Sequence, residues 1–320
     1  MRLKFIDHPI EISTREYEEL KSKLVDKLFK NNVVLSVYQM GSVKHPGISD
    51  LDIICVFKNG SQCHENLRLD LNKDEKNILT HSVFAIEEQD LILSMSNNLI
   101  SNLKHLGGKD LNLDKIEINT SGEIKKQIAL EYLVKMLITI DAQVTFKIIK
   151  LRAFLLLAKA IEFDLQLLNI NEGKLFDLVQ RVIQYRGQWF SEKPSIKEIT
   201  DLVISFNTEL RLFLEKELLV SRLHLPLEEF ILPGNFKIEK NNFFSIEHTG
   251  LVLPNMFSFL GRKYINVQNR FNSFKCKIPF DIPNSNSIHS ERFRFSEKMV
   301  LKNRKNYPHF ISLTTSLSIY

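Results

Sequence analysis

The sequence contains few residues that interrupt helices and strands and few that can form disulfide cross-links. Its 320 residues include 11 Gly, 9 Pro, 3 Cys and 1 Trp. The low Gly and Pro content excludes a collagen-like or long flexible chain and favours regular helices and strands. Cys55, Cys63 and Cys276 form neither an even-numbered disulfide framework nor a Cys-x-x-Cys pair, so we expect reduced thiols and no structural zinc site.

Long apolar runs are also missing. Residues 1–7 lack the uninterrupted apolar core of a signal peptide, and the most apolar helical stretch, residues 133–161, is interrupted by six charged side chains. A membrane-spanning helix needs about 20 mostly apolar residues. We therefore expect a cytoplasmic protein that has no membrane partner.

Acidic residues are scarce in one segment near the C-terminal end. Between residues 262 and 305, three acidic residues stand against eleven Lys or Arg, a local net charge of +8 in a chain whose total is +5. Aromatic residues are interleaved with these cations, as on RNA-binding surfaces and equally in the core of a small β-rich subdomain. We favour packing as the role of these aromatics and keep residues 262–305 as a candidate RNA contact.

The sequence does contain a pair of carboxylates between two apolar runs. The first run ends shortly before Gly41-Ser42, and Asp50-x-Asp52 then leads into the second run, residues 53–57. In a strand, side chains two positions apart share a face, so both carboxylates would project together. Two oxygen anions on one face can hold a Mg²⁺ ion that bridges substrate phosphates.

The Gly-Ser pair supplies groups that suit a phosphate. Gly41 lets the backbone bend sharply and come close to a ligand because it has no Cβ. Ser42 adds a hydroxyl, and the turn can aim backbone N–H groups at phosphate oxygens. Lys44 in the following loop and Ser49 beside the carboxylates are further candidate nucleotide-binding residues.

The order strand, Gly-Ser, spacer, Asp-x-Asp, strand resembles the signature of the polymerase-β-like nucleotidyltransferases, over about residues 15–95. The resemblance implies an enzyme with two Mg²⁺ ions that transfers a nucleoside monophosphate from an NTP, with ATP expected, to an acceptor hydroxyl. It implies that Asp50 and Asp52 bind metal and that Gly41 and Ser42 position the triphosphate. The motif does not specify the acceptor, and we favour a small molecule or a protein over RNA.

Enzymes of this family typically have a third metal-binding carboxylate on a neighbouring strand. The expected strand, residues 82–86, carries no acid before Glu87, which is our candidate catalytic residue and metal ligand. Glu87 can equally begin a helix after the strand, where acidic residues favour the helix dipole. Asp110, Asp114 and Glu117 are weaker substitutes. Without a third carboxylate, the alternative is a degenerate nucleotidyltransferase that binds nucleotide or a partner and catalyses nothing.

The remaining patterns predict an α+β protein in three parts. We expect a small mixed-sheet nucleotidyltransferase domain over residues 1–120, because the motif and its flanking apolar runs lie there. A run of helical periodicities predicts an α-helical bundle over residues 121–232. Residues 233–320 are expected to form a basic C-terminal extension with candidate strands.

Three shorter patterns predict local structure. Residues 13–30 have an apolar stripe at helical spacing, with acidic residues near the start. Ser195 and Glu198 have the spacing of a capping box at the start of another helix. Residues 236–238 and 243–246 are predicted to form a hairpin.

Overall fold

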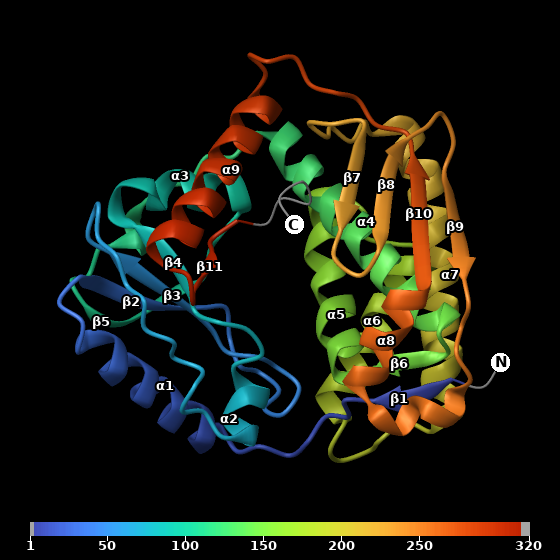
Figure 1. Cartoon of the computed structure of the whole chain (residues 1–320), viewed down its shortest axis with the longest axis horizontal. Coiled ribbons are helices and arrows are strands. Elements are labelled where there is room, and N and C mark those ends of the chain that lie inside the picture. Colours follow the sequence, from blue (N-terminus) through green and yellow to red (C-terminus); the bar gives the residue numbers. More distant parts are fainter. Residues whose placement is uncertain (1–2, 315–320) are drawn as a thin grey trace. The chain divides into compact units, whose positions relative to one another are not determined.

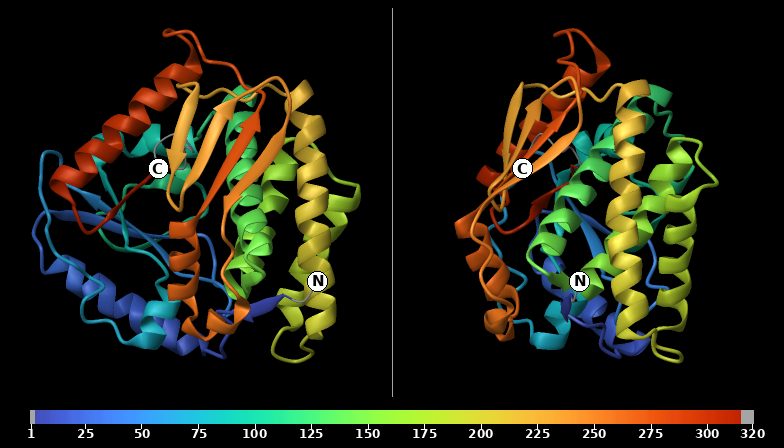
Figure 2. Two further views of the ribbon diagram at one scale, coloured as in Figure 1. Left: turned by 45° about the vertical axis from the view of Figure 1, so that its right-hand side comes forward. Right: turned by 90° about the vertical axis from the view of Figure 1, so that its right-hand side faces the viewer.

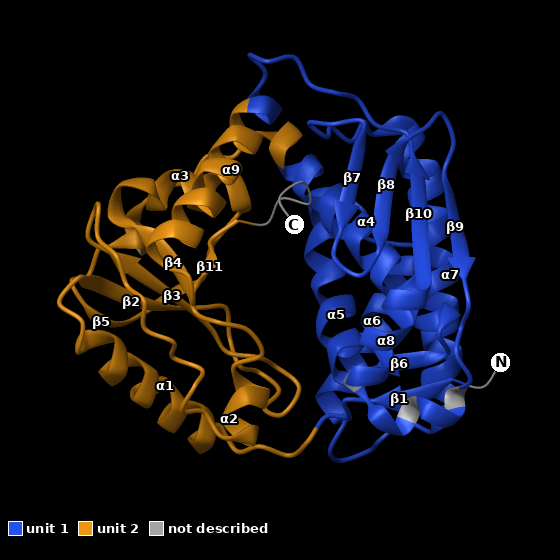
Figure 3. Cartoon of the chain, in the orientation of Figure 1, with its two compact units in different colours: residues 1–9, 125–290, 320 blue, residues 10–124, 291–319 orange. Residues whose placement is uncertain are grey.

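The computed structural model describes residues 3–314, apart from the side chains of residues 114, 255, 258 and 262. These residues form two units, which Figure 3 shows in different colours. The sheet unit contains residues 10–124 and 291–314, and the helical unit contains residues 3–9 and 125–290. Each unit therefore includes a segment from the other end of the chain.

The sheet unit is built around a mixed five-stranded sheet in the order β11-β4-β3-β2-β5 (Figure 1). The strands are Val34–Met40 (β2), Asp52–Phe57 (β3), Phe84–Glu87 (β4), Leu103–Gly108 (β5) and Ile311–Ser312 (β11). β2 runs antiparallel to β3 and β5, whereas β4 runs parallel to β3, and β11 parallel to β4. Because β3 and β4 run in the same direction, both begin at the same end of the strands. We call each of the two borders formed by strand ends an edge of the sheet.

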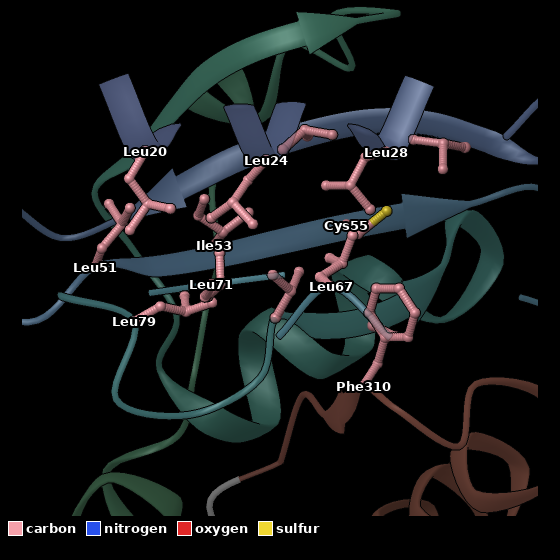
Figure 4. Packing of buried hydrophobic residues seen from close by; sticks show 14 of the residues in the cluster. Leu20, Leu24, Leu28, Leu51, Ile53, Cys55, Leu67, Leu71, Leu79 and Phe310 are labelled. Atoms are coloured by element: carbon pink, nitrogen blue, oxygen red, sulfur yellow. The ribbon is translucent and has the colours of Figure 1, made fainter. Parts of the chain in front are cut away.

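Helix α1, Thr14–Phe29, covers one face of this sheet. It begins with a capping box, in which the Ser13 hydroxyl accepts a hydrogen bond from the Glu16 N–H and the Glu16 carboxylate accepts one from the Ser13 N–H. Figure 4 shows its apolar stripe against β3. The labelled helix residues are Leu20, Leu24 and Leu28. Each buried leucine contributes about 1.5–3 kcal/mol, so this stripe anchors the helix. The helix predicted over residues 13–30 is confirmed.

Helices α3, Glu88–Asn98, and α9, Ile288–Asn306, lie on the opposite face of the sheet (Figure 1). Ile54 of β3 packs there with Met95 of α3 and Met299 of α9. The shorter α2, Lys73–Ile78, precedes β4 in the chain. Helices thus cover both faces of the sheet.

Residues 291–314 belong to the sheet unit, which corrects the prediction of a separate extension over residues 233–320. The ring of Tyr307 stacks on Phe57 with centroids 4.4 Å apart, and Phe310 contacts the same ring edge-on at 5.3 Å. These contacts join residues far apart in the chain, so no local pattern indicates them. Residues 1–2 and 315–320, which the predicted first and last parts included, lie outside the described residues.

Long helices make up much of the helical unit. They are α4 (Gly122–Thr145), α5 (Leu151–Leu167), α6 (Lys174–Gln188) and α7 (Ile196–Val220), with the shorter α8 (Arg262–Phe271). α7 begins with the predicted capping box, in which Ser195 and Glu198 exchange hydrogen bonds. Strand β1, Lys4–Ile6, pairs in parallel with β6, Ile148–Lys150, between α4 and α5.

A four-stranded sheet in the order β7-β8-β10-β9 completes the helical unit. Its strands are Glu229–Leu232 (β7), Phe236–Lys240 (β8), Ser245–Gly250 (β9) and Asn272–Ile278 (β10). The predicted hairpin between residues 236–238 and 243–246 is wrong, because β10 lies between β8 and β9 and pairs with both. In both views of Figure 2 the sheet lies along the helices, and Phe274 of β10 contacts Phe146 at the end of α4.

The structure is a mixed α and β protein, as the sequence predicts. Among residues 3–314, none of the helices combines the length and apolar character needed to cross a membrane.

Candidate functional site

One edge of the five-stranded sheet gathers most of the residues that the sequence singles out. Met40 at the end of β2 pairs with Asp52 at the start of β3, so the Gly41-Ser42 turn and the Asp50-x-Asp52 motif meet at this edge. β4 begins at the same edge because it is parallel to β3, with Ile54 opposite Phe84. The residues just before β4, including His81, therefore lie beside the carboxylates.

Asp50, Asp52 and His81 form the cluster at this edge. One potential ligand atom from each of the three lies within 4.8 Å of the others. The Nε2 atom of His81 is 2.7 Å from Oδ1 of Asp52, and the Thr80 hydroxyl donates a hydrogen bond of 3.2 Å to Oδ2 of Asp50. The side chains of His81 and Asp52 are 31% and 27% exposed, so an ion from solvent can reach them. Two carboxylates and one imidazole can hold a divalent cation.

The His81 ring is fixed by a second contact, on its other nitrogen. Nδ1 lies 2.8 Å from the carbonyl oxygen of Ser82. Burial lowers the pKa of His81, but its hydrogen bonds to Asp52 and to the Ser82 carbonyl, with the charges of Asp52 and Asp50, outweigh burial and raise the pKa. Sequence reasoning missed His81, since only the direction of β4 reveals that a residue before this strand faces Asp52.

The turn after β2 has the geometry expected for close approach of a ligand. Gly41 has φ = +69°, a conformation that favours glycine, and a Cβ built there would have no neighbour within 4 Å. Its N–H donates to the carbonyl of Asn102, the residue just before β5. Ser42 and Lys44 are exposed, so their hydroxyl and ammonium groups are accessible to a phosphate.

Ser49 has a different role from the one predicted. Its side chain is buried, and its Oγ accepts a hydrogen bond from the His45 N–H at 3.3 Å. The Ser49 N–H donates to the His45 carbonyl at 2.8 Å. Ser49 thus closes the loop that leads to Asp50, and this corrects its assignment as a nucleotide-binding residue.

Tyr17 of α1 also holds the loop before Asp50, through its side-chain hydroxyl. Its fully buried hydroxyl donates to the carbonyl of Ser49 at 2.6 Å and accepts from the Gly47 N–H at 3.0 Å. These two bonds fix the backbone immediately before Asp50. Helix α1 therefore positions the candidate metal ligands as well as covering the sheet.

Replacing Tyr17 with phenylalanine should destabilise the protein by about 1–3 kcal/mol, because two buried backbone groups lose their partner. Urea unfolding measures this change. The matched control is Tyr185→Phe in α6, a half-buried tyrosine for which a change below about 0.5 kcal/mol is expected. Equal stability of Tyr17→Phe and the unmodified protein would show that the loop does not depend on Tyr17.

Glu87 does not join the candidate metal ligands, contrary to the prediction. β4 does extend to Glu87, but it is parallel to β3, so Glu87 lies opposite Phe57 at the other edge of the sheet. Asp52 and Phe57 are five positions apart along β3, about 16 Å at the rise of an extended chain. Asp110 follows the end of β5, which pairs with the start of β2 and so also lies away from Asp52. Glu117 is absent from the described cluster, and the side chain of Asp114 lies outside the described residues.

Glu87 instead belongs to a buried ion-pair network with α9. Lys302 contacts Oε2 of Glu87 at 2.6 Å and Oδ2 of Asp90 at 2.7 Å. The Gly60 N–H donates to Glu87 at 3.0 Å, and the Tyr307 hydroxyl donates to it at 3.3 Å. Burial raises the pKa of a carboxyl, but the hydrogen bonds from Lys302 and Gly60 and the charge of Lys302 outweigh it, so the pKa of Glu87 is lowered.

This lowered pKa predicts a loss of stability in acid. Above the ordinary glutamate pKa of 4.5, ionised Glu87 stabilises the folded state fully, and this contribution is lost as the pH falls through the lower folded-state pKa. Glu87→Gln removes the titrating group. Urea unfolding at a series of pH values should therefore show a stability gap between the two proteins that is widest near neutrality and narrows below pH 4.5. A gap that stays constant with pH would contradict the assignment.

The basic segment over residues 262–305 is divided between the two units. Residues up to 290 belong to the helical unit, and the remainder belong to the sheet unit. Several of its cations are engaged within the chain: Lys275 and Lys277 pair with glutamates of neighbouring strands, and Lys302 pairs with Glu87. Arg292 is buried and donates to the carbonyl of Asn97. Part of the positive charge of this segment is therefore neutralised by ion pairs within the chain.

Comparison with known proteins gives no guide to this site. No family model matches the chain, and neither the curated proteins nor the solved structures that were compared contain a match.

Proposed function

We propose that the protein is a divalent-metal-dependent nucleotidyltransferase that transfers a nucleoside monophosphate from an NTP, with ATP expected, to an acceptor hydroxyl. The observation that carries this proposal is the meeting of the Gly41-Ser42 turn with Asp50 and Asp52 at one sheet edge. A turn with accessible backbone and hydroxyl groups suits phosphate oxygens, and paired carboxylates suit the cation that accompanies them.

Each residue of the edge has a defined role in this proposal. Asp50 and Asp52 hold the cation, which when bound neutralises charge on the triphosphate and makes the acceptor hydroxyl a better nucleophile. Gly41 and Ser42 orient the triphosphate, and the exposed Lys44 attracts its negative charge. The acceptor oxygen bonds to the α-phosphorus while the bond to the bridging oxygen breaks. Pyrophosphate leaves, and the hydroxyl proton passes to solvent.

The direct test is release of pyrophosphate from each of the four NTPs, with Mg²⁺ or Mn²⁺ and a panel of hydroxyl acceptors. Transfer of an α-labelled nucleotide to an acceptor identifies the product. Turnover that requires a divalent cation and is lost in the Asp50→Asn, Asp52→Asn double variant supports the proposal. Turnover that persists in that variant overturns it.

A second candidate is a nucleotide-binding protein without catalytic activity. The placement of Glu87 favours it, because only two carboxylates occur in the cluster found among residues 3–314. In that case ATP binds with a dissociation constant that depends on divalent cations, and no acceptor yields pyrophosphate. Equilibrium binding of ATP beside the turnover assay separates the two candidates.

For the acceptor, we favour a small molecule or a protein over RNA. The intrachain ion pairs of Lys275, Lys277 and Lys302 reduce the positive charge that residues 262–305 can offer to a polynucleotide. An RNA acceptor would bind with an affinity that falls steeply with salt, because each neutralised phosphate releases counterions. For a small-molecule or protein acceptor, we expect the Michaelis constant for the acceptor to depend only weakly on salt concentration.

A further inference from the structure

The third ligand of the candidate centre is a nitrogen, and this determines which cation suits it. The register that places Ile54 opposite Phe84, continued toward the start of both strands, brings Ser82 beside Asp52. This is the place on the neighbouring strand where a third carboxylate would stand. The chain has no acid there and instead brings His81 within 2.7 Å of Asp52.

The contact between His81 and Ser82 prepares Nε2 for metal binding. Because a carbonyl oxygen only accepts hydrogen bonds, Nδ1 carries a proton and donates it to the Ser82 carbonyl at 2.8 Å. Without a metal, Nε2 donates a hydrogen bond to Oδ1 of Asp52 at 2.7 Å; when a cation displaces this proton, the Nε2 lone pair faces the same space as the two carboxylates. Histidines that bind metals generally donate their other ring N–H to a carbonyl or carboxylate in this way. The Ser82 carbonyl is not part of the Asp50, Asp52 and His81 cluster, and its hydrogen bond with Nδ1 fixes the orientation of the His81 ring.

The donor set therefore contains two carboxylates and one imidazole. Mg²⁺ prefers oxygen ligands at near-ideal octahedral geometry and loses its water reluctantly. Imidazole adds affinity for first-row transition dications, whose binding to mixed nitrogen and oxygen sites exceeds that of Mg²⁺. We infer that this centre binds a first-row transition-metal dication in preference to Mg²⁺, with Nε2 of His81 as a direct ligand beside Asp50 and Asp52.

The inference rests on the proposed function only in placing the cation at Asp50 and Asp52, and its test does not need turnover. The probe is Mn²⁺, titrated into the full-length protein and followed by electron paramagnetic resonance, with Mg²⁺ as competitor. Spin-echo modulation from ¹⁴N reports directly whether an imidazole is bound to the ion. About a tenfold or larger excess of Mg²⁺ should be needed to displace half of the Mn²⁺.

Variants of His81 assign the nitrogen. His81→Ala should lose the ¹⁴N modulation and weaken Mn²⁺ binding by about 10- to 100-fold. His81→Asp keeps three ligands but makes all of them oxygens, so it should still bind Mn²⁺ while losing the preference over Mg²⁺. The matched control is His64→Ala, an exposed histidine of the same unit, which should retain the modulation.

Two results would overturn the inference: bound Mn²⁺ without ¹⁴N modulation, or displacement by an equal concentration of Mg²⁺. These results differ from a failure of the proposed function. Turnover with Mg²⁺ that is unaffected in His81→Ala would retain the nucleotidyltransferase and reject the nitrogen ligand. Mn²⁺ bound through His81, with no turnover of any NTP, would retain the nitrogen ligand and reject the enzyme.

Discussion

Asp52→Asn is expected to reduce nucleotidyl transfer by about a thousandfold or more. Asparagine keeps the shape of the side chain and an oxygen that can accept the His81 hydrogen bond, but it removes a negative charge from the proposed metal site. Loss of a group that stabilises charge in a transition state typically lowers the rate by about 100- to 1,000-fold, and loss of the metal lowers it further. Pyrophosphate release under saturating NTP measures the effect.

The matched control for this change is Asp26→Asn. Asp26 is an exposed aspartate of α1 in the same unit, and its replacement should leave the rate within about twofold, since surface substitutions rarely change stability by more than 0.5 kcal/mol. Circular dichroism should be the same for both variants. If Asp52→Asn kept a tenth or more of the rate, Asp52 would not be a metal ligand in the reaction.

Among the single substitutions proposed here, Lys302→Met should cause the largest loss of stability, about 3 kcal/mol or more. The variant leaves the carboxylates of Glu87 and Asp90 buried without their cation, and breaking a buried ion pair from one side typically costs 3–5 kcal/mol. The 21% exposure of the Lys302 side chain places the expected value at the low end. Hydrogen exchange of β4 and α9 measures the sheet unit, while fluorescence of Trp189 reports separately on the helical unit.

Two further proteins test the cause of that loss. Lys298→Met removes a lysine 4.0 Å from Asp90 whose side chain is 67% exposed, so it should change stability by less than about 1 kcal/mol. Adding Glu87→Gln and Asp90→Asn to Lys302→Met removes the uncompensated charges and should recover part of the loss. If Lys298→Met and Lys302→Met were equally stable, the buried network would not hold α9 to the sheet.

Local signals within helices predicted helical structure well, whereas the local signal for a hairpin over residues 236–246 did not. The capping box at Ser195 lies where the spacing of a hydroxyl and a glutamate indicated it. The apolar stripe from Tyr17 to Leu28 faces the core. These features depend on contacts within one helical turn or on one face of one helix, which the order of residues determines directly.

The composition of the candidate site could be predicted only in part, because it depends on strand direction. Asp50 and Asp52 belong to one short segment, and the sequence sufficed to bring them together. Glu87 and His81 lie at opposite ends of the β4 region, and which of them meets Asp52 depends on whether β4 is parallel or antiparallel to β3. No pattern within residues 81–87 contains that information, so the sequence favoured the acid over the imidazole.

The return of the chain to the sheet unit after residue 290 has a consequence for synthesis and for dissection of the protein. When residues 10–124 leave the ribosome, Phe57 still lacks Tyr307 and Phe310, and Glu87 still lacks Lys302. The incomplete sheet unit therefore keeps apolar surface uncovered while residues 125–290 are translated. A single proteolytic cut cannot release two complete halves either. A fragment that contains the complete sheet unit would have to join residues 10–124 to residues 291–314 through an artificial linker.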